Sequence, residues 1–169
     1  MKKNKFAKIG LSNKRGFTLI ELLVVIVVIS ILSAVVLVVL SDARKKGQDA
    51  GVKANLKTIS SQSGLFYGDN GSSFLPSGGS TFAIATCPTY SASGTNMLSK
   101  DPVVAGAIAE AVSRGGNGSS CYNSATLWSV AVGLRTDANK SWCVDSAGQS
   151  KQTNFAPGSA IDTSLFTCK

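Results

Sequence analysis

The chain of 169 residues contains no histidine. Serine and cysteine nucleophiles are ordinarily activated by a neighbouring histidine, so this absence excludes Ser-His and Cys-His catalytic arrangements. Acidic residues are also few, nine in all, and no two stand at a spacing that suggests paired catalytic carboxylates. The glycine clusters lack both the strand-GxGxxG-helix context of a dinucleotide site and the lysine of a phosphate-binding loop. The sequence therefore does not predict an enzyme.

Metal-binding and redox patterns are also missing. None of the four cysteines stands in C-x-x-C spacing, and without histidine a zinc site would need four widely spaced thiolates. Asp137, Asp145 and Asp162 are single acids without the D-x-D pattern of a calcium loop. We therefore predict no metal site and no cofactor.

What the chain has instead is one long apolar run close to its start. Between Leu22 and Leu40 only two serines interrupt the hydrocarbon side chains, and Phe17 to Leu40 contains neither glycine nor proline. A helix over these residues would reach roughly 36 Å at about 1.5 Å per residue, enough to cross a bilayer core of about 30 Å. We predict a membrane-spanning helix over residues 17–40.

Glu21 is the one carboxylate within this run. An ionised acid in a helix surrounded by hydrocarbon costs up to about 3 kcal/mol on insertion scales, and somewhat less near the helix end. A chain that needed only an anchor would do better with leucine at this position. We therefore expect Glu21 to have a charged partner.

The residues before Phe17 form a basic head with six lysines and arginines and no acid. A basic head before an apolar run is typical of a secretory signal peptide, but this run exceeds the usual signal core of about 7–15 residues. No small-x-small cleavage pattern follows the run, because residues 41–46 are polar and basic. The boundary that does resemble a cleavage site, Gly16–Phe17, lies in front of the run.

The segment Lys14-Arg15-Gly16-Phe17-Thr18-Leu19-Ile20-Glu21, followed by a long apolar run, resembles the class III signal of type IV prepilins and type II secretion pseudopilins. The resemblance covers residues 14–40 closely, and the family's long helix extends it to about residue 67. It implies that a prepilin peptidase cuts after Gly16 on the cytoplasmic side and that the new terminus, Phe17, is N-methylated. The alternative is an uncleaved signal anchor that tolerates a glutamate near its cytoplasmic end.

Cleavage would give Phe17 an α-amino group, which is a suitable partner for Glu21. In a bundle of such helices, Glu21 of one subunit can face the Phe17 amine of a neighbour, and a register error would leave both charges unpaired. The four-residue offset also places the two residues on one face of the same helix, so a pair within one subunit is the competing interpretation. The family resemblance favours the pair between subunits.

The net charge of +8 reflects the basic head rather than a nucleic-acid surface. Without residues 1–16 the chain keeps 11 basic and 9 acidic residues, and the basic residues beyond the helix are scattered in sequence. The positive-inside rule places the head in the cytoplasm and the C-terminal domain outside, although Arg44, Lys45 and Lys46 oppose this. We predict a single-pass protein of the inner (cytoplasmic) membrane, a cell-surface filament after assembly, and no nucleic-acid partner.

The patterns beyond the membrane, together with the resemblance, imply an α+β pilin fold with a long helix on a small antiparallel sheet. Residues 1–16 would be the leader, 17–40 the transmembrane and assembly helix, 41–67 its amphipathic extension and 68–169 the ectodomain. The predicted apolar stripe of the extension consists of Val52, Leu56, Ile59, Ser63 and Phe66. Gly47 and Gly51 are weak points of this helix.

Within the ectodomain, Asp101-Pro102 predicts the start of a short helix, with aspartate as N-cap and proline at the first position. Strands are predicted at 126–134, 141–145 and 150–153, and residues 81–86 form either a short strand or an irregular crossover. The first of these strands alternates, with Trp128, Val130, Val132 and Leu134 on one face. The tail from Asn154 has little periodicity.

An even number of cysteines in an exported domain favours disulfide bonds. Cys87, Cys121, Cys143 and Cys168 allow three connectivities, of which we favour Cys87–Cys121 and Cys143–Cys168. The second pair would tie down the C-terminal tail, a feature that is similar to the C-terminal disulfide loop of many pilins.

We therefore predict a structural subunit of a type IV pilus-like filament, a helical homo-oligomer polymerised through the 17–40 helix. The resemblance implies as partners the prepilin peptidase, an inner-membrane platform protein and a cytoplasmic assembly ATPase. A type II secretion pseudopilin and a minor or DNA-uptake pilin are the alternatives within the family, and the missing calcium loop favours the pilin over the pseudopilin. An extracytoplasmic enzyme on a signal anchor is the alternative from another class.

Overall fold

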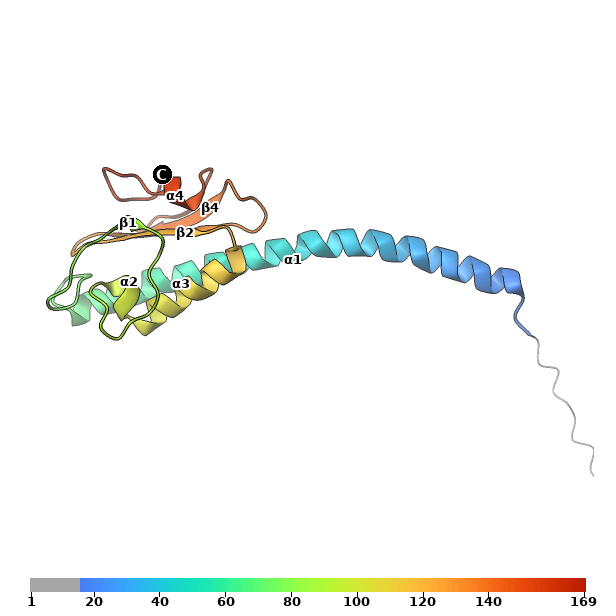
Figure 1. Ribbon diagram of the computed structural model, residues 1–169, viewed down its shortest axis with the longest axis horizontal. Coiled ribbons are helices and arrows are strands. Elements are labelled where there is room, and N and C mark those ends of the chain that lie inside the picture. The colour runs from blue at the N-terminus through green and yellow to red at the C-terminus, as the bar shows by residue number, and fades with distance from the viewer. Residues whose placement is uncertain (1–15) are drawn as a thin grey trace, which may run out of the picture. The chain divides into compact units, whose positions relative to one another are not determined.

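The computed structural model describes residues 16–169, so most of the basic head, including Lys14 and Arg15 of the signal motif, lies outside the described residues. The chain divides into two compact units, one ending at Leu40 and the other covering Ser41–Lys169. The elements in chain order are α1 (Leu19–Asp69), β1 (Phe82–Ala85), α2 (Met97–Lys100), α3 (Pro102–Gly115), β2 (Ser119–Asn123), β3 (Trp128–Gly133), β4 (Ser141–Asp145), β5 (Ser150–Thr153) and α4 (Pro157–Ala160) (Figure 1).

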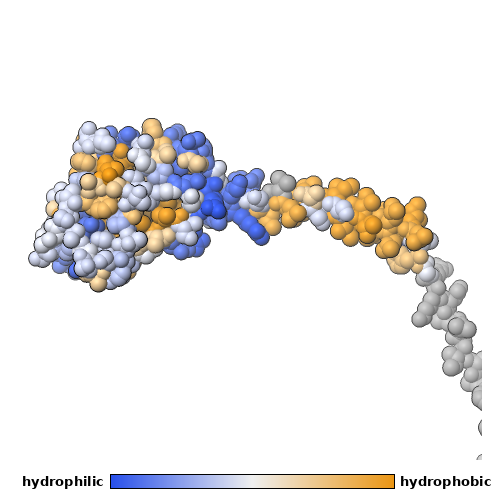
Figure 2. Space-filling view, in the orientation of Figure 1, coloured by the Kyte–Doolittle hydropathy of each residue, from blue (hydrophilic) through white to orange (hydrophobic). Residues whose placement is uncertain are grey.

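The first unit contains the apolar half of helix α1. Large apolar side chains in this half are exposed, from 43% for Leu40 to 89% for Leu19, and Figure 2 shows hydrophobic residues along most of it. Ser30 donates its hydroxyl hydrogen to the Ile26 carbonyl at 2.7 Å, so its polar group is satisfied within the helix, as a lipid environment requires. In the described part of the chain, α1 is the one helix long and apolar enough to cross a membrane.

In the second unit α1 is amphipathic, and its apolar stripe is buried against the rest of the unit. The buried residues of this stripe are Val52, Leu56, Ile59, Ser63 and Phe66. Burial at this spacing confirms the predicted stripe, since residues three and four apart share one helix face.

The glycines expected to weaken α1 do not interrupt it, and the helix continues two residues past the predicted end, to Asp69. At Gly51, a Cβ atom would stand 2.6 Å from the Cδ atom of Arg114 on α3. The missing side chain therefore allows the Arg114 side chain to lie directly over α1. Arg114 also pairs with Glu110, one turn earlier on α3, at 2.6 Å.

A five-stranded antiparallel sheet forms the centre of the second unit, in the order β1-β2-β3-β4-β5. Each strand pairs with its neighbour in sequence, so the sheet is a meander. On β3, Val130 lies opposite Cys121 of β2 and Val144 of β4. The structure thus confirms the α+β fold with a long helix on an antiparallel sheet, and the 81–86 segment contains the short strand β1.

The sheet is covered on both faces (Figure 1). Helices α1 and α3 pack on one face, where Leu56 and Ile108 meet Trp128 and Val130. On the other face the tail forms a second apolar cluster, which consists of Ala131, Cys143, Ala160, Ile161 and Cys168. All of β3 is buried as a result, whereas the sequence alternation identified only the face that carries Trp128.

Helix α3 begins as the Asp101-Pro102 pair predicts. The Asp101 carboxylate accepts hydrogen bonds from the N–H groups of Val103 and Val104 at 2.8 and 2.9 Å, and Pro102 occupies the first turn. The helix ends where Gly116 takes a left-handed conformation with φ of 72°. The short helix α2 just before it, capped by Asn96, was not predicted.

Disulfide bonds join Cys87 to Cys121 and Cys143 to Cys168, which are the two pairs favoured from the sequence. The second bond fastens the tail to β4, and a buried carboxylate supports it. Asp145 is 1% exposed, and its Oδ2 atom accepts the Cys168 N–H at 2.9 Å. Its Oδ1 atom accepts two further backbone N–H groups in the β4–β5 turn, so the buried charge is fully hydrogen-bonded.

A second buried carboxylate joins α1 to the loop between β3 and β4. Asp49 is 6% exposed and accepts the N–H of Arg135 at 2.5 Å and the N–H of Thr136 at 3.3 Å. It also accepts the Thr136 hydroxyl. Hydrogen bonds to an ionised acceptor are stronger than neutral ones, so Asp49 fixes this loop beside the helix.

Candidate processing and assembly site

Gly16 and Phe17 lie in non-helical backbone just before α1 and are exposed, the Phe17 side chain to 86%. A side chain at Gly16 would meet no atom within 4 Å apart from its chain neighbours. The fold therefore does not require glycine here, and any requirement for glycine comes from a partner that binds this segment. The peptide bond predicted to be cut is open to such a partner.

Thr18 and Glu21 form a reciprocal cap at the start of α1. The Glu21 Oε2 atom accepts both the N–H and the hydroxyl of Thr18 at 2.8 Å, while the Thr18 Oγ1 atom accepts the Glu21 N–H at 3.3 Å. This is a capping box, in which a threonine and a glutamate three residues later satisfy each other's free N–H groups. Glu21 thus has a role within its own helix before any assembly.

Glu21 also lies in an apolar hollow of 380 Å³, which is lined by Phe17, Ile20, Glu21, Val24 and Val25. These residues recur at helical spacing and share one face of the helix. Glu21 therefore lies on the same face as Phe17, with apolar side chains beside it.

The structure places Phe17 and Glu21 on one face without joining them as an ion pair. In the uncut chain the Phe17 nitrogen belongs to a peptide bond and carries no charge, so the pairing of its amine with Glu21 stays a prediction. Thr18 is the residue of this site that the sequence interpretation missed. The role of Thr18 could have been predicted, because T-x-x-E in front of an apolar run is the capping-box pattern.

The acids considered for a calcium loop are used by local backbone groups. The N–H of Asn139, followed by Lys140, lowers the pKa of Asp137, and the N–H groups of Leu165 and Ser164 lower the pKa of Asp162. Asp145 is bonded to the tail and the β4–β5 turn, as described above. Among residues 16–169, His, Cys, Asp and Glu side chains form no group of three that could hold a metal ion.

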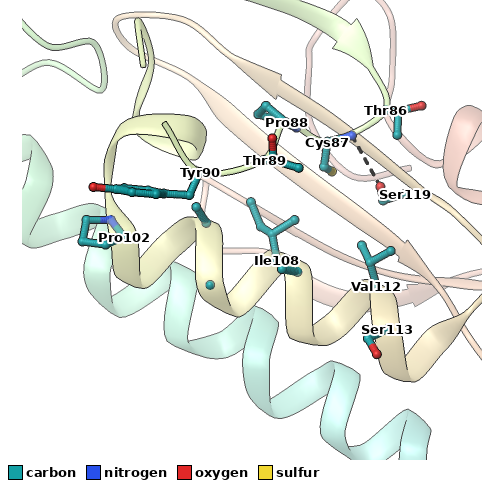
Figure 3. A pocket seen from close by; sticks show the side chains of 13 residues that line it. Thr86, Cys87, Pro88, Thr89, Tyr90, Pro102, Ile108, Val112, Ser113 and Ser119 are labelled. Atoms are coloured by element: carbon teal, nitrogen blue, oxygen red, sulfur yellow. Dashed lines mark hydrogen bonds between the residues drawn. The ribbon is translucent and has the colours of Figure 1, made fainter. Parts of the chain in front are cut away.

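The ectodomain has a larger hollow, of 630 Å³, between α3 and the segment 86–90 that follows β1. Figure 3 shows Ile108 and Val112 of α3 pointing toward Cys87, whose N–H donates to the Ser119 hydroxyl at 3.4 Å. Cys87 is disulfide-bonded, and the other side chains are mostly aliphatic, hydroxyl-bearing or proline. This lining offers no nucleophile and base in the arrangement that covalent catalysis needs.

Comparison with known families matches residues 11–40 to the prokaryotic N-terminal methylation motif. Neither the curated proteins nor the solved structures give a match to this chain. The matched segment includes the exposed Gly16–Phe17 bond, the capping box and the apolar half of α1. Residues 11–40 therefore carry the class III signal peptide of type IV pilins and pseudopilins, a motif that supports a pilin-like or pseudopilin subunit.

Proposed function

We propose that this chain is a structural subunit of a type IV pilus-like filament, polymerised through the apolar half of α1. The observation that carries the proposal is the exposed apolar helix, with its single carboxylate, inside the methylation motif. An extended exposed apolar surface marks a contact with a membrane or with another protein. In the filament, the helices of neighbouring subunits would take the place of the lipid around this surface. The ectodomain, fastened by two disulfides, would form the filament surface.

In this proposal residues 1–16 are a cytoplasmic leader that prepilin peptidase removes after Gly16, and Phe17 is then methylated. Residues 17–40 span the membrane and later form the filament core, residues 41–67 extend the helix, and residues 68–169 lie outside the cell. Assembly would require a platform protein in the inner membrane and an ATPase in the cytoplasm. These partners come from the family resemblance.

A pseudopilin of a type II secretion system is the alternative. We favour the pilus because Asp137, Asp145 and Asp162 are single acids without the D-x-D pattern of a calcium loop, and each already accepts nearby backbone N–H groups. A minor or DNA-uptake pilin is a further alternative, for which the ectodomain would need a basic patch with aromatic side chains.

The capping box allows the cap role and the proposed assembly role of Glu21 to be separated. Glu21→Gln keeps an acceptor that can complete the box and removes the charge. Thr18→Val removes the hydroxyl of the box and keeps the charge. Both variants would be expressed in a host with the complete assembly machinery, and both leader cleavage and sheared filaments would be quantified.

We expect Glu21→Gln to be cleaved and to yield few or no filaments, since the Phe17 amine of a neighbour would lose its partner. We expect Thr18→Val to be cleaved and to assemble. Equal loss of filaments in both variants would mean that Glu21 acts only as a cap. Normal filaments from Glu21→Gln would contradict the charge pairing between subunits.

A further inference from the structure

Basic side chains gather where the second unit begins, directly after the last apolar residue of the first. Arg44, Lys45 and Lys46 are all exposed, and they point in directions about 100° apart around α1. The two ion pairs in the described part of the chain, Arg114–Glu110 and Lys140–Asp137, do not include them. Figure 2 shows hydrophilic residues gathered at this start of the second unit.

A fourth cation, Arg135, lies near these three residues because the Asp49 carboxylate holds the β3–β4 loop beside α1. Lys45 and Lys46 precede Asp49 by four and three residues, so all three share one side of α1. Because Asp49 holds the Arg135 N–H at 2.5 Å, the β3–β4 loop is fixed on that side. Arg135 is exposed and is likewise outside the two ion pairs. We call Arg44, Lys45, Lys46 and Arg135 the basic collar.

The collar lies at a depth that suits lipid headgroups. Arg44 to Lys46 follow Leu40 by roughly 6–9 Å along a helix that rises about 1.5 Å per residue. The polar layer of one leaflet is roughly 5–8 Å thick outside the hydrocarbon core. In the structure the Arg135 guanidinium lies against Gly116 at the C-terminal end of α3, so its long side chain must swing away from there to reach that layer.

The charge of the collar is not cancelled by its surroundings. The nearby acids are Asp42, which is exposed, and Asp49, which is buried and bonded to the loop. The acids Asp137 and Glu110 are already paired with other cations. Four cations therefore face two carboxylates, of which only Asp42 is open to solvent.

We propose that the basic collar binds anionic phospholipid headgroups in the leaflet from which the ectodomain emerges. Basic residues next to a membrane span attract anionic lipids, with an effect that falls off within a Debye length. Such contacts fix the depth of the unassembled subunit and favour the membrane-bound subunit over the assembled one. The inference rests on membrane anchoring by α1 and does not depend on which filament the subunit builds.

The test uses the full chain in phosphatidylcholine bilayers that contain trace spin-labelled lipid. The fraction of motionally restricted label gives the relative association of labelled phosphatidylglycerol over labelled phosphatidylcholine. The collar variants are the triple R44Q/K45Q/K46Q and the single Arg135→Gln. The matched control replaces three basic residues elsewhere in the second unit, K57Q/K100Q/K151Q. The basic head is present in every protein, so its own lipid preference cancels in the comparison.

We expect a several-fold preference for phosphatidylglycerol in the unaltered chain, and at least a twofold reduction of that preference in the triple variant. Arg135→Gln should lower it less, the control should leave it unchanged, and 0.5 M salt should remove the difference. Equal restriction of phosphatidylcholine in all proteins shows that each is inserted. A triple variant with the original preference, or a control with the same loss, overturns the proposal. If the triple variant fails to insert, unchanged selectivity in Arg135→Gln overturns it.

Discussion

Two glycines on helix α3 should respond in opposite ways to the same substitution. Gly115 is buried at the end of α3, where a Cβ atom would stand 2.1 Å from the carbonyl oxygen of Gly133 on β3. Gly106 is exposed on the same helix, and a Cβ atom there would meet nothing within 4 Å. Gly115→Ala therefore tests the packing of α3 on the sheet, and Gly106→Ala is its matched control.

The magnitude follows from the contact distance. A carbon atom and a carbonyl oxygen normally stay more than about 3.3 Å apart even in weak C–H···O contacts, so α3 and β3 must separate by roughly 1 Å. Overpacking of this kind costs about 1–3 kcal/mol, and here both contacting parts are backbone and cannot move away as a side chain would. With the upper end of that range, about 3 kcal/mol, and up to about 1 kcal/mol regained in helix propensity by alanine, the net loss for Gly115→Ala is about 2 kcal/mol. Gly106→Ala should gain about 0.5–1 kcal/mol.

Urea unfolding in detergent micelles, followed by tryptophan fluorescence, measures both values. Trp128 and Trp142 are the two tryptophans of the chain, and both lie in the sheet, so the signal reports the ectodomain. With a slope of about 1.5 kcal/mol per molar urea, Gly115→Ala should lower the midpoint by about 1.3 M. A midpoint for Gly115→Ala equal to that of Gly106→Ala would refute the close packing of α3 on β3.

Three further substitutions test other parts of the second unit by the same unfolding assay. Replacing Cys143 and Cys168 together by serine should cost about 3.5 kcal/mol in the chain-entropy treatment of a loop closed over a separation of 25 residues; a loss below about 1 kcal/mol would contradict it. Asp49→Asn should cost about 1–3 kcal/mol and speed hydrogen exchange at the β3–β4 loop amides, because an amide accepts these N–H groups less well; unchanged exchange would argue against the Asp49 contact. The pKa of Asp162 is lowered in the folded chain, so its contribution to stability is present above the unfolded pKa of about 3.9 and is lost as pH falls through the folded value. Asp162→Asn should therefore flatten the fall of the urea midpoint below about pH 4, and an unchanged pH profile would count against this role.

Those parts of the fold that depend on local pattern could be predicted from the sequence. The stripe that includes Val52 and Leu56 follows from helical spacing, and the start of α3 follows from the chemistry of Asp101-Pro102. Strands β3, β4 and β5 follow from alternation and from the turn residues between them, whereas β2 was not predicted. Each of these features depends on residues that are close to one another in the sequence.

Features that depend on tertiary contacts could not be predicted. The tail has no period, so its packing on the sheet and the bond from the Cys168 N–H to Asp145 were not predicted, although the disulfide that fastens it was favoured from the sequence. Asp49 looks like an ordinary polar residue of a helix, and it is buried only because the β3–β4 loop folds over it. The second buried face of β3 was missed for the same reason, since the tail that covers it carries no pattern.

At the candidate site, the resemblance identified the residues and the structure added their local roles. Glu21 was singled out because a lone carboxylate in an apolar helix needs a partner, and Thr18 is its partner in the unprocessed chain. The proposed partner after cleavage, the Phe17 amine, exists only once the leader is removed. A single uncut chain therefore contains the cap and the apolar hollow, while the proposed ion pair requires processing.

The most direct test of the central claim is the intact mass of the protein extracted from the membranes of a host that processes prepilins. A processed subunit should have a mass that begins at Phe17 and carries one added methyl group, and this mass should increase by four hydrogens on reduction of the two disulfides. A mass that begins at Met1 in such a host would contradict processing as a prepilin and would identify the chain as an uncleaved signal anchor.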